Sequence, residues 1–296
     1  MSSVPALPPL DDADDDIDVH GLTHPGLVRG ENQDHFLIAA LTRHAEVRQT
    51  SLPHALDWPR DERIGFLAMV ADGVGGGDAG EEASRLAVAR ATALVNHGIR
   101  CVYGAGDPTV AIPQSLMNAA HRVPADITRR AIDLGVRRMA TTLTLWLGIW
   151  PHAYLLQVGD SRCYILRGTT LTQLSRDQTV AQQLVESGAL DAATAADTPW
   201  ANVLTSAIGG GEAEPVVTTF RMERNAVGLL CSDGLTKHVS DARIRERLLT
   251  MTSARQACEA LLQDALDAGG TDNVTIVVGR ARRRGRTTPP DQSAYG

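Results

Sequence analysis

The sequence predicts an α+β layered sandwich, and three observations support this fold class. Short runs rich in β-branched and aromatic residues follow one another across short turns, which is the pattern of antiparallel meanders. The predicted helices are fewer and longer, and they are grouped before and after the strands, which argues against a doubly wound parallel sheet. No composition break and no internal repeat divides the 296 residues, so one domain of about 260 residues is the simplest organisation.

Strands are predicted where apolar runs are bounded by turn residues, and helices where apolar residues recur on one face. The first long helix begins at Asp78, in a segment that resembles a capping box, and is expected to end at Gly98. The predicted strands cover residues 34–41, 64–71, 141–149, 153–158, 162–167, 216–220, 227–231 and 274–279. The predicted helices cover residues 78–97, 113–135, 179–187, 241–250 and 253–268.

Both ends of the chain are expected to lie outside the domain. Residues 1–18 are rich in proline and aspartate, which predicts a disordered, solvated acidic tail. Residues 281–296 are basic and contain prolines, so a second disordered tail is expected there. The domain then spans 19–280. Within it, residues 177–211 form a long and weakly apolar insertion between strands, which predicts a surface flap.

Charge and cysteine content exclude several classes of function. The formal net charge is −7 and the sequence pI is about 5.7, so the field of the whole molecule does not favour nucleic acid. The four cysteines lack C-x-x-C spacing, which argues against a zinc site or a disulfide framework and favours a reducing cytoplasm. The N-terminus lacks a basic region followed by an apolar stretch, and no run reaches the length of a membrane span. We therefore expect a cytoplasmic protein that binds neither nucleic acid nor membranes.

Aspartates stand where several strongly apolar runs begin or end, at the predicted rims of a sheet. Strand ends that are far apart in the sequence can lie side by side in the fold, so these carboxylates could converge on one ion-binding centre. Their oxygen atoms suit Mg²⁺ or Mn²⁺ rather than zinc, and a carboxylate shared by two ions would hold them about 3.5–4 Å apart with an acidified water between them. For any single aspartate, a turn or a helix cap is the alternative. The residues are Asp34, Asp72 with the following Gly73, Asp233 and Asp272.

Arg29 lies five residues before Asp34 and is a candidate phosphate ligand. A guanidinium can hold a phosphate by two parallel hydrogen bonds, which an ammonium cannot match. An ordinary surface arginine is the alternative. The glycine run after Asp72 is not a nucleotide-binding P-loop, because Asp78 and Ala79 stand where Lys and Ser or Thr would be required.

Six short motifs occur in the order and spacing of bacterial PP2C-type protein phosphatases, and the chain resembles that family over roughly residues 20–280. The resemblance implies two antiparallel β-sheets flanked by α-helices, with a centre of two Mn²⁺ or Mg²⁺ ions at one end. It also implies hydrolysis of phosphoserine and phosphothreonine by metal-activated water, without a covalent intermediate. The motifs are THPGLVRGENQD (23–34), VADGVGG (70–76), TTLT (141–144), GDSR (159–162), CSDG (231–234) and GTDN (270–273).

The resemblance further implies the metal ligands. Asp72 would bridge the two ions, and Gly73 would give its carbonyl oxygen to one of them. Asp233 and Asp272 would complete the first ion, while Asp34 would hold metal-bound water.

Other motif residues receive different roles from the resemblance. Arg29 would bind the substrate phosphate. Residues 141–144 and 159–162 would support strand packing around the site. Relatives often have a histidine, proposed as the general acid, where this chain has Val74, so protonation of the leaving group would fall to water or to another group.

A further departure concerns a third ion. Many members have an acidic residue four positions after Asp233, and this chain has Lys237, whose charge would repel a cation. Asp133 is the candidate for the other third-ion carboxylate, although its distance from the TTLT motif is unusual. We predict that a third ion is weak or absent. For His35 and His238 a packing or surface role is expected.

Two functions follow as hypotheses. The first is a metal-dependent protein serine/threonine phosphatase that acts on phosphorylated proteins and opposes a bacterial Ser/Thr kinase. The second is a catalytically weak or inactive regulator that binds phosphoproteins on the same scaffold, an idea supported by Lys237. A monomer is expected in either case.

Overall fold

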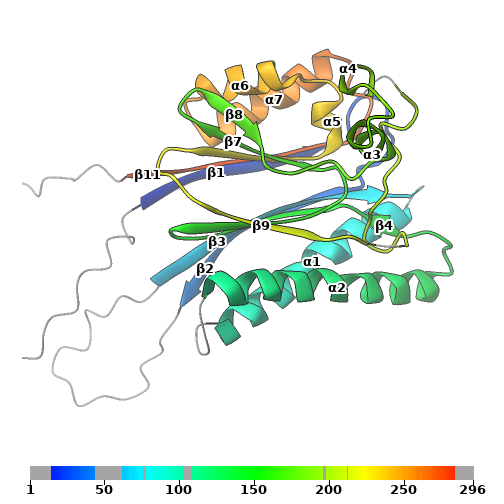
Figure 1. Cartoon of the computed structure of the whole chain (residues 1–296), viewed down its shortest axis with the longest axis horizontal. Coiled ribbons are helices and arrows are strands. Elements are labelled where there is room, and N and C mark those ends of the chain that lie inside the picture. Colours follow the sequence, from blue (N-terminus) through cyan, green and yellow to red (C-terminus); the bar gives the residue numbers. More distant parts are fainter. Residues whose placement is uncertain are drawn as a thin grey trace, which may run out of the picture.

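Two antiparallel β-sheets lie face to face between two groups of helices (Figure 1). The computed structural model describes residues 15–43, 62–75, 78–102, 108–195, 198–211 and 213–283. The five-stranded sheet has the order β1-β11-β10-β7-β8, and its strands are β1 (Asp15–His24), β11 (Val274–Arg283), β10 (Val227–Cys231), β7 (Arg162–Arg167) and β8 (Thr170–Gln173). Every pairing in it is antiparallel.

The six-stranded sheet has the order β2-β3-β5-β6-β9, with β4 paired to the end of β3. Its strands are β2 (Asp34–Arg43), β3 (Glu62–Val74), β4 (Ala140–Thr141), β5 (Leu143–Ile149), β6 (His152–Val158) and β9 (Val216–Arg221). The strand predicted over 141–149 is therefore broken at Thr142. Each predicted strand is present, and the local antiparallel pairing confirms the α+β sandwich.

Helices cover the outer face of each sheet. The long helices α1 (Asp78–Val102) and α2 (Pro108–Leu134) pack on the six-stranded sheet. The helices α5 (Asp233–Thr236), α6 (Asp241–Leu249) and α7 (Ala254–Asp267) pack on the five-stranded sheet. Between β8 and β9, the short helices α3 (Val180–Glu186) and α4 (Ala192–Ala195) lie in the segment predicted to be a flap.

Side-chain alternation along the strands produces three apolar layers. Residues at odd positions of β5, such as Leu143, Leu145 and Leu147, face the α1–α2 layer. Even positions face the opposite sheet, where Trp146 joins a smaller cluster that contains Val277. This period of two is the ordinary geometry of a strand buried on both faces. The layer between the sheets therefore receives one residue in two from each strand.

Strand β1 corrects the prediction of a tail over 1–18, because it begins at Asp15 and pairs with β11 along its whole length. Asp18 explains why an acidic segment joins the sheet. Its carboxylate accepts hydrogen bonds from the Ala254 backbone N–H at the start of α7 and pairs with Arg280 at 3.0 Å. β11 likewise continues to Arg283, inside the segment predicted to be a basic tail. Residues 1–14 and 284–296 lie outside the described residues.

Helix α1 also differs from its prediction, because it continues past Gly98 to Val102. A Cβ atom at Gly98 would collide with the hydroxyl of Ser115 on α2. The glycine therefore allows close approach of two helices, and it does not end the first one. The contact between α1 and α2 was not visible in the sequence of either helix alone.

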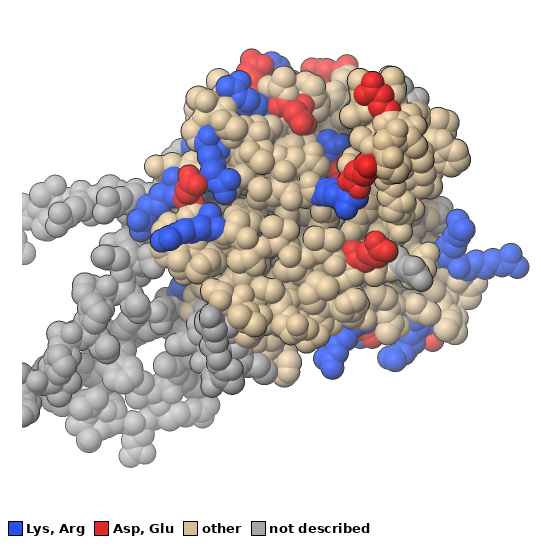
Figure 2. All heavy atoms as spheres, in the orientation of Figure 1, with Lys and Arg blue, Asp and Glu red and all other residues tan. Residues whose placement is uncertain are grey.

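The described surface is mixed in charge, and acidic and basic side chains are interspersed over the face shown in Figure 2. None of the described helices combines the length and the apolar sequence that crossing a bilayer requires. Cys163, Cys231 and Cys258 are buried and free.

Candidate metal centre and phosphate site

The four predicted aspartates lie at the end of the two sheets where β2 begins and where β3 and β10 end, and each of the other three affects the charge of Asp72. This end of the sheets is on the right in Figure 1. Asp34 begins β2 and is the cross-strand partner of Asp72 on β3. Asp233 directly follows β10 as the first residue of α5, and Asp272 lies just before β11. The antiparallel order thus places residues from distant parts of the chain at the same rim.

Asp34 is the most deeply buried of these carboxylates, with 3% of its surface exposed. Its Oδ2 accepts a hydrogen bond from the Thr275 hydroxyl at 2.7 Å, while its Oδ1 has no partner. Burial raises the pKa of Asp34 to about 6, although the hydroxyls of Thr275 and Ser232 oppose that shift. Asp233 Oδ1 is also buried and without a partner. Unpaired buried oxygens of this kind favour a bound cation.

Two threonines hold the backbone of Asp72 in place. The Asp72 N–H donates to the Thr142 hydroxyl at 3.0 Å, and the Thr141 hydroxyl donates to the Asp72 carbonyl at 2.8 Å. The TTLT motif is therefore attached directly to the site. Burial, followed by the charge of Asp34, raises the pKa of Asp72 well above its usual range.

Gly73 stands where no side chain would fit. A Cβ atom there would collide with the carbonyl group of Gly80 in α1 and would lie 2.8 Å from the carbonyl oxygen of Gln33. The Gly73 N–H donates to that same Gln33 oxygen at 3.1 Å. Close contact with two neighbouring backbones fixes the turn that follows Asp72.

Two positively charged side chains, those of Lys237 and Arg29, contact the aspartate cluster. Lys237 Nζ lies 2.6 Å from Asp233 Oδ2 and 2.8 Å from Asp272 Oδ2. Arg29 donates from Nε to Asp272 Oδ1 at 2.8 Å and from Nη2 to Oδ2 at 3.2 Å. Burial would raise the pKa of Asp272, but the hydrogen bonds from Lys237 and Arg29 hold it below the usual range.

Asp160 is a site carboxylate that the sequence prediction missed. It follows β6 in the GDSR motif and is buried, and its pKa is raised to about 8 by burial and then by the charge of Asp233. Asp133, which the sequence analysis named as the candidate carboxylate for a third ion, is instead exposed near the C-terminal end of α2. The available signal was positional, because Asp160 comes two residues after the end of the apolar strand β6.

Asn273 is a second residue that was not predicted, and it anchors the loop that carries Arg29. Its Nδ2 donates to the carbonyls of Pro25 and Glu31 at 2.9 and 2.8 Å, and its Oδ1 accepts from the Gln33 N–H at 2.9 Å. This side chain fastens the loop between β1 and β2 to the start of β11. It thereby brings Arg29 to Asp272.

The two histidines near the site make structural contacts. His35 Nδ1 lies 2.9 Å from the Ser84 hydroxyl, and burial lowers its pKa. His238 Nε2 accepts from the Thr271 backbone N–H at 3.0 Å, which steadies the turn before Asp272. These contacts agree with the packing or surface role expected for both histidines.

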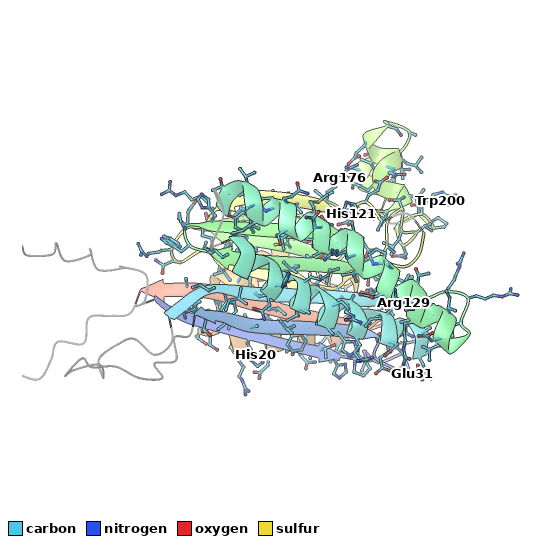
Figure 3. All side chains as sticks on the ribbon, turned by 90° about the horizontal axis from the view of Figure 1, so that it is seen from below. His20, Glu31, His121, Arg129, Arg176 and Trp200 are labelled. Carbon is cyan, nitrogen blue, oxygen red and sulfur yellow. The ribbon has the colours of Figure 1, made fainter. Side chains whose placement is uncertain are left out.

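The segment 177–211 is attached to the site at its base. Arg162 of the GDSR motif pairs with Asp177 at 2.7 Å, where this segment begins. Near its other end, Thr141 and Ile208 exchange two backbone hydrogen bonds, so the segment returns beside Asp72. Figure 3 shows Trp200 on this projecting segment, at the same end of the molecule as Glu31 of the Arg29 loop.

The donor set fits a hard divalent cation, because it consists of carboxylate and carbonyl oxygens. As the side chains stand, no three His, Cys, Asp or Glu side chains within the described ranges are close enough to ligate one ion. Instead, positively charged side chains contact two of these aspartates. Lys237 lies against Asp233 and Asp272, and Arg29 lies against Asp272. The unpaired oxygens of Asp34 and Asp233 nevertheless match a cation site.

Comparison with known sequences identifies related proteins. The profile of the family described as protein phosphatase 2C matches residues 45–269. The chain is 34% identical over 212 residues to the serine/threonine protein phosphatase PstP of Mycobacterium tuberculosis, an alignment that covers 72% of this chain and 40% of that relative. It is 30% identical over 213 residues to the protein phosphatase PhpP of Streptococcus pneumoniae, covering 72% of this chain and 84% of the relative.

Solved structures agree with the sequence comparison. The crystal structure of M. tuberculosis PstP/Ppp has a TM-score of 0.72 at 30% identity, with 90% of this chain and 99% of that chain covered. The catalytic domain of PstP in complex with two manganese ions has a TM-score of 0.67 at 30% identity, with 90% and 98% covered. The sequence profile and these structures together show that the chain belongs to the protein phosphatase 2C family.

Proposed function

We propose that the protein hydrolyses phosphoserine and phosphothreonine in other proteins, with two Mn²⁺ or Mg²⁺ ions as cofactors. The observation that carries this proposal is the meeting of Asp34, Asp72, Asp233 and Asp272 at one rim, where two buried carboxylate oxygens lack partners. Such oxygens are stabilised by a bound cation. The presence of two manganese ions in the PstP structure supports this choice of ion.

We propose the following ligands. Asp72, the Gly73 carbonyl, Asp233 and Asp272 would hold the ions, with Asp72 as the ligand common to both, and Asp34 would act through water. When bound, the two ions would supply an acidified water as nucleophile and would offset the charge of the phosphate. The buried position of Asp34 and its bond to Thr275 keep one oxygen fixed and leave the other available.

Arg29 is proposed to bind the substrate phosphate. Its side chain is 57% exposed, so it can reach an incoming protein substrate. It now uses two N–H groups on Asp272, and a phosphate could accept the same parallel pair. Asn273 supports this role by fastening the Arg29 loop.

The test is hydrolysis of a phosphothreonine peptide by the pure full-length protein, with Mn²⁺ and with chelator. Phosphate release is expected with Mn²⁺ and should stop when the metal is chelated. Release that continues in chelator would contradict the metal mechanism.

A phosphoprotein-binding regulator is the second candidate. The contacts of Lys237 and Arg29 with Asp272 favour it, because both cations compete with metal for that carboxylate. This function predicts saturable binding of the phosphothreonine peptide and no turnover with Mn²⁺ or Mg²⁺. The same assay therefore separates the two candidates.

Lys237 is proposed to weaken metal binding and to replace the third ion. It is the only lysine of the 296 residues, and its ammonium bridges two of the proposed ligands. A divalent ion that binds Asp233 and Asp272 must therefore displace an existing pair of ionic contacts. Asp160 is close enough to Asp233 to feel its charge and could serve as one carboxylate for a third ion. The second carboxylate that such an ion would need is replaced by the positively charged Lys237.

Lys237→Asp should raise the affinity for Mn²⁺ by about tenfold or more, measured by titration calorimetry, and should increase turnover. Arg255→Asp is a matched charge reversal on α7 at a side chain that is 70% exposed, and it should leave metal binding unchanged. Unchanged Mn²⁺ binding and turnover in Lys237→Asp would count against the role. Because Lys237 is the only lysine, its labelling by an amine-reactive reagent, resolved from that of the N-terminal amine by peptide mass spectrometry, is a readout independent of activity, and Mn²⁺ should increase it.

We also propose that the protein is a cytoplasmic monomer that opposes a Ser/Thr kinase by acting on its substrates. The reduced cysteines Cys163, Cys231 and Cys258 support a reducing compartment. Co-purification of a phosphorylated kinase substrate with the Asp72→Asn variant would support the partner, and size-exclusion chromatography with light scattering tests the monomer.

A further inference from the structure

A cavity of about 410 Å³ lies between the two sheets at the end opposite the aspartate cluster. It is found where β1 begins and β11 ends, on the left in Figure 1. Its apolar walls come from both sheets and include Phe66, Trp146, Trp150 and Met222. An apolar cavity of about 150 Å³ is enough for benzene, so this volume can hold a molecule of two or three rings.

Two neighbouring glycines form the wall of the cavity on the five-stranded sheet. Gly228 on β10 and Gly279 on β11 are cross-strand partners, and both line the cavity. They lie two residues from Leu230 and Val277, which belong to the apolar cluster between the sheets, so they share that face of the sheet. Among the described residues, a Cβ atom added at Gly228 would meet one neighbour, the Gly279 carbonyl oxygen, at 3.8 Å. The missing side chains therefore leave open space.

Larger residues close this space at its edges. In the row of the two glycines, the next partner on one side is Val19 of β1, and on the other side it is Ile165 of β7. On the opposite sheet, Gly148 of β5 has Phe66 of β3 as its partner. All four of these residues line the cavity. The result is a slot with bare glycine backbone on both sheets, and because packed sheets lie roughly 10 Å apart, a flat molecule suits it.

The charged side chains that line the cavity already have partners. Arg280 pairs with Asp18 at 3.0 Å, and Glu223 pairs with Arg167 at 3.2 Å. Arg63, the third charged residue of the described lining, is not free either. A charged ligand would therefore lose its hydration here without gaining an unpaired counter-charge, which is unfavourable. The balance of charge favours a neutral ligand.

We propose that this cavity binds a neutral, flat, apolar molecule of two or three rings between the sheets. The aromatic walls provide faces and edges for ring contacts, and the paired charges at the lining select against an ion. The site shares no lining residue with the aspartate cluster, so the proposal does not depend on the proposed phosphatase activity.

The test is titration of the full-length protein with N-phenyl-1-naphthylamine, a neutral molecule of three rings whose fluorescence increases in apolar surroundings. Saturable binding of one molecule per chain is expected, with a decrease in tryptophan emission because Trp146 and Trp150 line the cavity. The anion 8-anilinonaphthalene-1-sulfonate has the same three rings and should bind about tenfold more weakly or worse. Equal or tighter binding of this sulfonate would contradict the selection for a neutral ligand.

Gly228→Val should fill the slot and reduce the affinity for N-phenyl-1-naphthylamine by about tenfold or more. Thr219→Val, on an exposed position of β9 that does not line the cavity, is the matched control and should leave the affinity unchanged. Gly279→Ala is a smaller change, because its Cβ atom would lie 3.4 Å from Val19 Cγ2, and it should weaken binding several-fold.

Two results would overturn the proposal. One is the absence of saturable binding to wild-type protein, as expected if another part of the chain fills the cavity. The other is binding as tight as that of wild type in a folded Gly228→Val or, if that variant does not fold, in Gly279→Ala.

Discussion

The two ends of the layer between the sheets are built from the same strands and have opposite chemistry. Towards the aspartate cluster, the inward positions of β5 and β11 are Thr144 and Thr275, and Ser232 continues the same face of β10. Two residues further along come Trp146, Val277 and Leu230, and two residues further still come glycines 148, 279 and 228. Each strand thus passes from hydroxyl to apolar side chain to no side chain.

The difference shows how one scaffold separates polar chemistry from apolar packing. At the polar end the hydroxyls are buried and each makes hydrogen bonds, as in Thr275 to Asp34 at 2.7 Å and Thr144 to the Ser161 carbonyl at 2.8 Å. At the other end the glycines leave space. A buried polar group is tolerated only where a partner exists, so the two sets of residues are not interchangeable.

Asp72→Asn should have the largest effect of the substitutions at the two ends, because it removes the central carboxylate of the polar end. We expect phosphatase activity to fall by about a hundredfold to a thousandfold, a loss of the size seen when one preorganised electrostatic group is removed. Mn²⁺ binding should also weaken, as measured by calorimetry. Asp133→Asn, exposed on α2, is the matched control and should retain activity. Full activity in Asp72→Asn would exclude the proposed centre.

On β11, replacing a polar residue of the polar end by an apolar one should destabilise the protein, and so should the reverse replacement in the apolar cluster. Thr275→Val removes the donor to Asp34, and Val277→Thr places a hydroxyl in the apolar cluster. Each should lower the free energy of unfolding by about 1–3 kcal/mol, the usual cost of an unsatisfied buried polar group. Urea unfolding measures both changes. If either variant is as stable as wild type, the division between the two ends is weaker than described.

The raised pKa of Asp160 predicts a pH dependence of the metal-free protein. Its folded pKa is about 8, above the ordinary value of 3.8, so the folded state keeps a proton that the unfolded chain has lost between those pH values. The contribution to stability is therefore present at low pH and is lost as pH rises through about 8. Asp34, with a folded pKa of about 6, acts with the same sign.

In chelator, the melting temperature of wild type should fall between pH 6 and 9 by on the order of a few degrees relative to Asp160→Asn. The comparison is made by differential scanning calorimetry. Parallel curves for the two proteins would show that Asp160 does not hold its proton in the folded state.

Gly228→Val should give the smallest effect, and it should be stabilising. A β-branched residue suits a strand, and the open space at this position accepts it. We expect the free energy of unfolding to rise by about 0.5–1 kcal/mol, in the range of cavity-filling substitutions. A clear loss of stability in urea unfolding would mean that the far end is packed more tightly than its lining implies.

Strand periodicity and the carboxylates at strand ends could be predicted from the sequence, because both are local. The polar end was therefore largely anticipated, from Asp34 and Asp72 to Asp233 and Asp272. Asp160 lies near a strand end, as the other four do, but it was missed because its burial and the nearby charge of Asp233, which distinguish it from an ordinary turn aspartate, depend on tertiary structure. The far end was not anticipated, since a glycine in one strand reveals a cavity only when the facing sheet is known.

The errors at β1 and α1 have the same origin. Local sequence predicts a tail for the aspartate-rich segment, because Arg280, the partner of Asp18, lies 262 residues away along the chain. Local sequence predicts a helix end at Gly98, because the residue that the glycine accommodates, Ser115, belongs to another helix. In both places a distant contact outweighs the local propensity.

The pairing of β1 with β11 has a consequence for the order of assembly. These strands align over ten residues and join the first and the last strand of the domain. Arg29 and Asp34 follow β1, whereas Asp272 precedes β11, so the cluster cannot close before nearly all of the domain has been synthesised. Long-range pairing of this kind is slow to form. A nascent chain that lacks β11 therefore carries most of the proposed ligands but no complete centre, so the proposed hydrolysis is expected to begin only once β11 has emerged.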